Sequence, residues 1–382
     1  MDGTIPVRDR REGKRGIISV GSVDYTLMIV VLMLVMIGVV MVFTSSYMTA
    51  DARLGDPYYY LKRQGVFFLI GTAGMLLMAN FNYKYLRSWA FIIYTVANAL
   101  LVLVFFIGIS SHGATRWIPM PIIGQFQPSE VAKAGVIFFL SFLISQNPKI
   151  LYKWPTFLLC CGLAALTSGL VFLGNNMSTA IIITLIGVGI IFIACPYILR
   201  FIMAGAAGVG AILAYLALSA ASENFRAARF QVWLDPFSDT SDKAFQVVQS
   251  LYAIGSGGLF GLGIGQSRQK TFVPEAHNDI IFSIICEELG FVGAALVLTL
   301  FGILIWRGIK IALDAPDTFS SLTASGIVLL ISVQVLINVA VVTNSIPNTG
   351  VPLPFISYGG TSLLVAMGLM GILLNISRCS KN

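Results

Sequence analysis

The chain has 382 residues, of which 57% are hydrophobic and 11% are charged, and its mean hydropathy is +0.86. One soluble core cannot hide so many apolar side chains, which excludes an ordinary soluble enzyme and favours a polytopic membrane protein. The net charge of +7 is typical of contacts with anionic lipid and of membrane topology, so it gives no nucleic-acid-binding signal. The five cysteines lie in or beside apolar segments without metal-ligand spacing, and they indicate neither disulfides nor a zinc site.

Apolar runs long enough to cross a bilayer predict an all-α integral membrane protein with about ten transmembrane helices. In chain order, the expected helices span residues 23–45, 65–81, 90–108, 130–145, 156–173, 178–194, 199–218, 279–306, 322–344 and 361–377. The first apolar run is too long for the core of a signal peptide, so it should remain as the first span. We therefore expect a polar tail over 1–22, one membrane domain over 23–377 and a short tail over 378–382.

An even number of spans places both termini on one side of the membrane. Most Lys and Arg residues in the short loops and tails of the chain lie on the same side as the termini. The positive-inside rule then makes both termini cytoplasmic. The long loop over 219–278, between the seventh and eighth helices, becomes extracellular, and a loop of this length is usually functional or disordered.

The stretch "GATRWIPMPIIGQFQPSEVAK" carries a first group of charged residues before and inside the fourth helix. Pro128 can occupy the first turn, and Glu130 and Lys133 then share one helical face. Two charges at a membrane interface are costly unless they neutralise each other. We therefore interpret this pair as internal, with the structural role of fixing the helix. Arg116 and Trp117 fit either an interfacial anchor or an anion contact beside an apolar surface.

The long loop carries four cations at the two ends of a glycine-rich stretch, "YAIGSGGLFGLGIG": Arg226, Arg229, Arg268 and Lys270. Exposed N–H groups of such a stretch can receive anionic oxygens, so the cluster favours a phosphate group as ligand. A purely structural loop is the alternative for each single residue. The stretch is also apolar, and we expect it to pack on the membrane surface or dip into it.

The stretch "TFVPEAHNDIIFSIICEELG" gathers acids and one of the two histidines. If a helix begins near Asn278, Asp279 lies in its first turn, either as a cap or as a functional acid near Glu275 and His277. Acids at membrane depth, here Glu287 and Glu288, are functional candidates, with a structural salt bridge as the alternative to a proton relay.

The stretch "NSIPNTGVPLPFISYGGTSLL" contains three prolines and three glycines, which prevent a continuous helix. Its backbone should therefore line a protein or water cavity rather than contact lipid. A transporter and an enzyme are both compatible with such a segment.

Taken in order, "RWI", "QPSE", "GLGIGQSRQKTFVPEAH", "EELG" and "PLPFISYGGTS" resemble the SEDS family (shape, elongation, division and sporulation), over about Asp24 to Ile376. The match looks closer to the FtsW and SpoVE branch than to RodA. The resemblance implies a ten-helix fold and peptidoglycan glycosyltransferase activity on lipid II, the undecaprenyl-pyrophosphate-linked disaccharide pentapeptide. It also implies a class B penicillin-binding protein as partner, within the division or spore-cortex machinery.

The resemblance assigns the essential aspartate of the family to Asp279. It assigns the acid and lysine of the "QPSE" motif to Glu130 and Lys133, and an outer arginine to Arg63. Ser357 and Tyr358 in the last motif are further candidates for substrate contact. The chain departs from the family at Asn278, where a threonine is usual, and at "GNNMSTA", where an acidic motif is common.

The expected reaction is attack of an acceptor 4-hydroxyl on the anomeric carbon of the donor, with inversion, and Asp279 as general base. The candidate pyrophosphate contacts are Arg116, Arg226, Arg229, Arg268 and Lys270. A bound divalent cation is an alternative source of positive charge. No nucleotide cofactor is required, because the donor is already activated. A lipid II flippase and a non-enzymatic scaffold for a transpeptidase are the rival hypotheses.

Overall fold

The structure is a computed structural model that describes residues 22–111, 114–120, 124–203, 205, 233–237, 242–273 and 275–379. Within these ranges, eight helices are long and apolar enough to cross a membrane. The prediction of a helical integral membrane protein is confirmed. Most of the seventh expected span, 199–218, lies outside the described residues, so the total of about ten spans stays an expectation.

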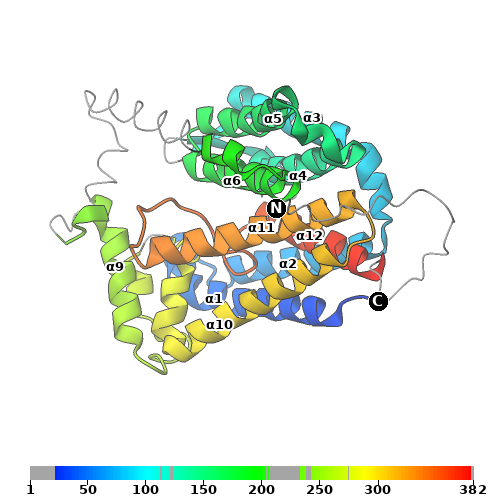
Figure 1. Cartoon of the computed structure of the whole chain (residues 1–382). Helices are drawn as coiled ribbons and strands as arrows, with labels where there is room; N and C mark the ends of the chain where they lie inside the picture. Colours follow the sequence, from blue (N-terminus) through cyan, green and yellow to red (C-terminus); the bar gives the residue numbers. More distant parts are fainter. Residues whose placement is uncertain are drawn as a thin grey trace, which may run out of the picture.

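The long helices form two layers (Figure 1). One layer contains α3 (Tyr83–Ile107), α4 (Pro128–Gln146), α5 (Trp154–Leu173) and α6 (Met177–Ala194). The other contains α1 (Tyr25–Leu54), α2 (Tyr59–Asn80), α10 (Ile281–Leu313), α11 (Thr318–Val342) and α12 (Gly360–Cys379). Contacts of α11 with α4 and α6 join the layers. At one end, α9 (Asp242–Gly257) lies across the direction of the long helices and packs against α10.

Local side-chain chemistry sets several helix starts. Asp24 accepts a hydrogen bond of 3.0 Å from the N–H of Leu27 and caps α1. Asp317 and Ser320 form a capping box at the start of α11. Pro128 is the first residue of α4, where its missing N–H leaves no helical bond unmade, as the sequence indicated.

Several observed helices extend beyond the apolar runs that predicted them. The first continues to Leu54 instead of ending near residue 45, and the second begins at Tyr59 instead of residue 65. Hydropathy marks only the part of a helix inside the bilayer, whereas polar turns can continue into water. In α1 they continue until Gly55, whose φ of 68° ends the helix.

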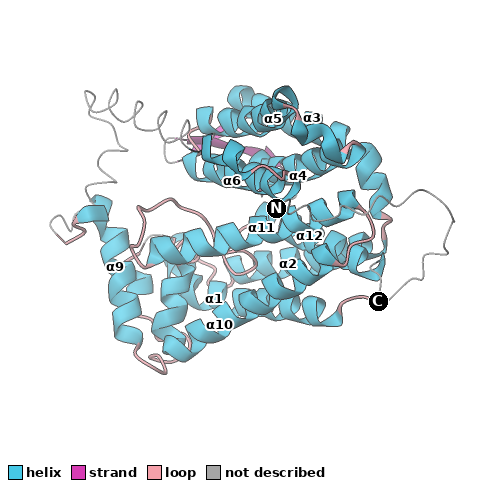
Figure 2. Ribbon diagram, in the orientation of Figure 1, coloured by secondary structure: helices cyan, strands magenta, loops and turns pink. Residues whose placement is uncertain are grey.

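A small antiparallel sheet connects α3 to α4 (Figure 2). Its strands are β1 (Ile109–Ser111), β2 (Ala114–Met120) and β3 (Gly124–Phe126), in the order β1-β2-β3. The sequence analysis expected no strands in this protein. Strands of 3 to 7 residues provide too little alternation to be recognised, and Pro119 interrupts the longest of them.

The helix α10 is broken near its start, at Gly290, where φ is 67° and ψ is −166°. The carbonyls of Glu287 and Glu288, before the break, accept hydrogen bonds from the N–H groups of Leu262 (2.9 Å) and Gly263 (3.0 Å). Two further backbone bonds join the glycine-rich stretch to the residues just after the break. The stretch therefore packs against α10 and satisfies backbone groups that the break would leave unpaired.

The start of α1 and the end of α12 lie at the same end of the bundle. The N–H of Asp24 donates to the hydroxyl of Ser377 (3.2 Å), and its carboxylate pairs with Arg307 of α10 at 2.6 Å. The turns that precede α10 and α12 lie at the opposite end. Those turns contain most of the candidate site residues.

Candidate active site

Asp279 belongs to a turn whose backbone is fixed by the C-terminal third of the chain. The carbonyls of residues 277, 278 and 279 accept, in that order, from the N–H of Tyr358 (2.9 Å), the hydroxyl of Ser357 (2.8 Å) and the amide of Asn338 (2.7 Å). We call these three donors the carbonyl clamp. Asn338 is fully buried and Ser357 nearly so, which makes the clamp rigid.

The Asp279 side chain is half-buried and lies just before α10, which begins at Ile281. The residue at the N-cap position is Ile280, one residue after Asp279. The carboxylate lies against Gly350, where a Cβ atom would come within 3.0 Å of the Asp279 Oδ2 atom. The clamp amide of Asn338 also donates to the carbonyl of Val351, at 2.7 Å, and so ties this loop to the Asp279 turn.

Three rings from three segments meet beside this turn: Tyr60 of α2, His277 and Tyr358. The Tyr60 ring centroid lies 4.3 Å from that of His277 and 5.0 Å from that of Tyr358, and the last two are 5.5 Å apart. We call this group the aromatic platform. The Arg63 guanidinium lies 5.2 Å from the ring centroid of Tyr59, at the edge of the platform. Arg63, His277 and Tyr358, all predicted site residues, are therefore brought together.

Burial has a clear electrostatic effect on the platform. It lowers the pKa of His277 to about 4, although the negative charge of Glu275 opposes the shift. Burial also raises the pKa of Tyr358, against the opposing effect of the Arg63 guanidinium. Both groups are therefore neutral at pH 7.

The lowered pKa of His277 predicts that the stability of the protein depends on pH. The folded protein keeps the ring neutral, whereas the unfolded chain binds a proton below the ordinary pKa of 6.5. The free energy of unfolding should therefore fall by ~3 kcal/mol as the pH drops from 6.5 to 4. Thermal unfolding in detergent across this range measures the effect. His277→Phe keeps a ring but cannot titrate, so it should flatten the dependence; an unchanged slope would contradict the assignment.

The two acids of the "EELG" motif are fully buried and are held by the segment that precedes them. The Glu287 carboxylate accepts from the Ser267 hydroxyl and from the backbone N–H of Arg268, at 2.9 Å for the latter. The Lys270 ammonium lies 3.6 Å from the carboxylate of Glu288 and donates to a backbone carbonyl at 2.6 Å. The structure thus gives Glu288 an ion-pair partner, at a distance longer than a hydrogen bond.

This arrangement changes the interpretation of the cations near the glycine-rich stretch. Lys270 is only 5% exposed and its charge is directed at Glu288, so it is an internal ion-pair partner rather than an open anion contact. The Arg268 side chain is exposed, and its backbone is fixed through Glu287. Arg226 and Arg229 lie outside the described residues.

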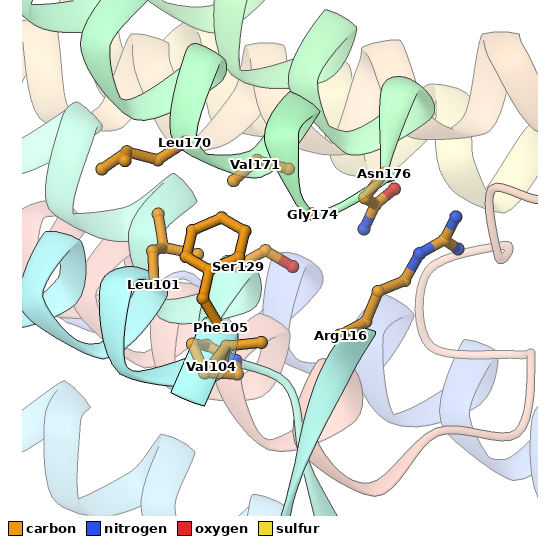
Figure 3. A pocket seen from close by; sticks show the side chains of 10 residues that line it. Leu101, Val104, Phe105, Arg116, Ser129, Leu170, Val171, Gly174 and Asn176 are labelled. Atoms are coloured by element: carbon orange, nitrogen blue, oxygen red, sulfur yellow. The ribbon is translucent and has the colours of Figure 1, made fainter. Parts of the chain in front are cut away.

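Arg116 and Trp117 lie on β2, and both side chains are half-buried. Arg116 donates to the carbonyl of Asn175 at 2.5 Å, in the turn between α5 and α6. Figure 3 shows its side chain and that of Asn176 at one side of a mostly apolar pocket, with Leu101 and Phe105 at the other side. A cation beside an apolar pocket is compatible with either of the two roles considered for Arg116.

Glu130 and Lys133 form an ion pair of 2.8 Å inside α4, and their side chains are only 9% and 2% exposed. Glu130 also lines a cavity together with Gln334 of α11 and Ser357 of the carbonyl clamp. The pair therefore lies at the junction of the two helix layers, below the turn that carries the clamp.

The two departures from the family pattern have local structural roles. The amide of Asn278 donates to the carboxylate of Glu275 at 2.8 Å, and Glu275 has a positive φ of 56°. Asn176, in "GNNMSTA", accepts from the N–H of Thr179 at 3.2 Å and caps α6. Among the described residues, no group of three His, Cys, Asp or Glu side chains is arranged to hold a metal ion.

Three residues at the site were not predicted from the sequence: Tyr60, Gly350 and Asn338. Tyr60 belongs to three consecutive tyrosines just before Arg63, which was a visible signal. An asparagine inside an otherwise apolar span, such as Asn338, is a further signal, because a buried amide needs partners. Gly350 had no signal beyond the general richness of its loop in glycine and proline.

Comparison with known families and structures identifies the family of this chain. The profile of the FtsW/RodA/SpoVE family of cell cycle proteins matches residues 25–382. Stage V sporulation protein E of Bacillus subtilis is 40% identical over 366 residues, covering 94% of this chain and 98% of that protein. The probable peptidoglycan glycosyltransferase FtsW of Trichlorobacter lovleyi is 37% identical over 358 residues, covering 93% of each chain.

Solved structures show the same fold. A chain of a peptidoglycan synthase complex that coordinates polymerization and crosslinking aligns with a TM-score of 0.78 at 26% identity, covering 93% of this chain and 98% of that chain. The rod shape determining protein RodA of Thermus thermophilus aligns with a TM-score of 0.69 at 26% identity, covering 94% and 98%. These matches extend over nearly the whole chain, and the protein therefore belongs to the FtsW/RodA/SpoVE family of cell cycle proteins.

Proposed function

We propose that this protein is a peptidoglycan glycosyltransferase that polymerises lipid II into glycan strands. Its family membership and the names of its relatives support this activity. The structural observation that carries the proposal is the half-buried carboxylate of Asp279, held on a clamped turn at the end of the bundle where Arg63, Arg116 and Arg268 also lie. A fixed base at an end of the bundle that also carries cations fits glycosyl transfer from a pyrophosphate donor.

In the proposed reaction, the 4-hydroxyl of the acceptor N-acetylglucosamine attacks the anomeric carbon of a lipid-linked donor strand. Asp279 takes the hydroxyl proton as general base. The bond from the anomeric carbon to the pyrophosphate oxygen breaks, undecaprenyl pyrophosphate leaves, and the anomeric configuration inverts. Side-chain cations, with or without a divalent cation, offset the charge that develops on the leaving group. Repeating the assay with a chelator tests the need for a divalent cation.

The reaction is proposed to occur at the outer face of the bacterial cytoplasmic membrane, with both termini in the cytoplasm. The beginning of α1 and the end of α12 share the end that carries Lys84, Arg307 and Arg378, in accordance with the positive-inside rule. Asp279 lies at the other end. By analogy with the synthase complex that this chain resembles, we propose a class B penicillin-binding protein as partner, in division or spore-cortex synthesis.

One assay tests the proposed function directly. The purified protein, with its partner, is incubated with labelled lipid II in the presence of moenomycin, which blocks the unrelated class A glycosyltransferases. Polymer formation is the expected result. If lipid II crosses a vesicle membrane but no polymer forms, the protein is a flippase. If neither occurs and only the transpeptidase is activated, it is a scaffold.

Gly350→Ala is expected to reduce turnover without abolishing folding. A methyl group at this position would meet the Asp279 carboxylate at 3.0 Å and would also strain a φ of +66°. Displacing a catalytic group slightly costs ~10–10²-fold in rate. Gly55→Ala is the matched control, because it has the same strain, with a φ of +68°, but nothing within 4 Å. Equal polymerisation rates in the two variants would show that Gly350 does not position Asp279.

A further inference from the structure

The aromatic platform lies in the same turn as the proposed base. Tyr358 donates its N–H to the carbonyl of His277, two residues before Asp279. Tyr60 reaches both rings from α2. The His277 ring is buried, whereas the tyrosine rings are half-buried and keep part of their surface accessible. The platform is therefore an accessible aromatic surface attached to the carbonyl clamp.

A belt of aromatic residues at the membrane interface is the ordinary explanation for tyrosines at helix ends. The protein contains such a group on α1 and just before α2, where the rings of Phe43, Tyr47 and Tyr58 lie 5.6 to 6.4 Å apart. Tyr47 and Tyr58 are 41% and 48% exposed, as expected for belt residues. The platform differs from this belt in two ways. It surrounds a buried histidine, and two of its rings come from the turns that precede α10 and α12. Anchoring at the membrane interface requires neither feature.

Charged groups at the edge of the platform provide polar contacts. The Arg63 guanidinium lies over the ring of Tyr59, which packs against Tyr60, and its positive charge opposes the rise in the pKa of Tyr358. The guanidinium therefore lies at the edge of the platform. The negative charge of the exposed Glu275 carboxylate has an electrostatic effect on both Tyr60 and His277. Aromatic faces attract the weakly positive C–H groups of a sugar ring, while a guanidinium donates to hydroxyls and a carboxylate accepts from them. Such a combination suits a carbohydrate better than a lipid chain.

We propose that Tyr60, Tyr358 and Arg63 form a saccharide-binding site that holds the acceptor N-acetylhexosamine beside Asp279. This inference rests on the proposed function. The base must lie within hydrogen-bond reach of the hydroxyl from which it takes the proton, and that hydroxyl belongs to the acceptor. The sugar that occupies a surface in the same turn as the base is therefore the acceptor sugar.

A binding experiment with a soluble probe tests the site apart from catalysis. The probe is a glucosaminyl-muramyl tetrasaccharide that lacks both lipid and pyrophosphate, and its affinity for the purified protein with its partner is measured by saturation-transfer NMR. Tyr60→Leu and Arg63→Gln should each weaken binding about tenfold, as expected for loss of one stacking or charge-assisted contact. Tyr58→Ala, in the belt, is the matched control and should bind like the parent.

Thermal unfolding in detergent shows whether each variant is folded. Arg63→Gln leaves the ring packing in place, so it keeps the test valid if Tyr60→Leu fails to fold. Parent-like affinity in folded Tyr60→Leu or in Arg63→Gln, or absence of probe binding by the parent, would overturn the proposal.

Steady-state kinetics separate this proposal from the function on which it rests. The two platform variants should raise the apparent KM for the acceptor and change kcat little, unlike substitution of the base. If the parent polymerises lipid II but does not bind the tetrasaccharide, the saccharide site is wrong and the function stands. If it binds the probe through Tyr60 and Arg63 but forms no polymer, the saccharide site stands and the function is wrong.

Discussion

Asp279→Asn is expected to lower lipid II polymerisation by ~10²–10⁴-fold, the usual cost of losing a general base. Asparagine is nearly isosteric, and the bond from Asn338 is made to the backbone carbonyl of residue 279, which the substitution keeps. Expression, membrane insertion and association with the penicillin-binding protein should therefore be preserved. Initial rates of strand synthesis from labelled lipid II, compared with those of the parent at equal protein concentration, measure the effect.

The same variant distinguishes the rival hypotheses. A flippase would lose lipid II movement across a vesicle membrane, and its parent would make no glycan. A scaffold would lose affinity for its partner. Strand synthesis by Asp279→Asn at the rate of the parent would rule out the proposed role of the carboxylate, whatever the family similarity implies.

Glu130→Ala is expected to destabilise the folded protein by ~3–5 kcal/mol, because it leaves the buried Lys133 ammonium without a counter-charge. The thermal midpoint in detergent should fall, and the yield of folded protein should decrease. Replacing both partners by apolar residues of similar volume, Glu130→Leu with Lys133→Met, should recover part of the loss, since no unpaired charge then remains.

The exposed pair of Lys62 and Asp56 is the control for this prediction. Its N–O distance of 2.8 Å equals that of the buried pair, but its side chains are 68% and 39% exposed. Asp56→Ala should therefore leave the thermal midpoint close to that of the parent, because water screens the remaining charge. If Glu130→Ala, Lys133→Ala and the double variant all melted like the parent, the internal pair would have no structural importance.

Much of the fold follows from local properties of the sequence. Apolar runs predict helices because a backbone inside a bilayer must satisfy its own hydrogen bonds, and this holds whatever the neighbouring helices are. The start of α4 at Pro128 and the pairing of Glu130 with Lys133 follow from helical periodicity alone. Asp279 was a candidate because it follows Glu275 and His277 at the expected start of a helix, and because the resemblance to the SEDS family assigns the essential aspartate to it.

Only the tertiary structure could decide how the charged residues divide into roles. Lys270 and Arg268 are two positions apart and look alike in the sequence, but burial against Glu288 makes the first structural and leaves the second exposed. The break at Gly290 depends in the same way on distant partners, since its backbone is satisfied by the glycine-rich stretch.

The sequence by itself determined the membrane-protein class and the positions of the described spans, because both depend on the polarity or helical spacing of nearby residues. Its motifs also single out Asp279 as the proposed base. Only the tertiary structure brings together the residues of the carbonyl clamp and of the aromatic platform. Tyr60, Asn338 and Tyr358 all lie far from Asp279 in the chain, and they reach its turn only because α2, α11 and α12 pack together with α10. No local pattern encodes such contacts, since they arise from the joint packing of several helices.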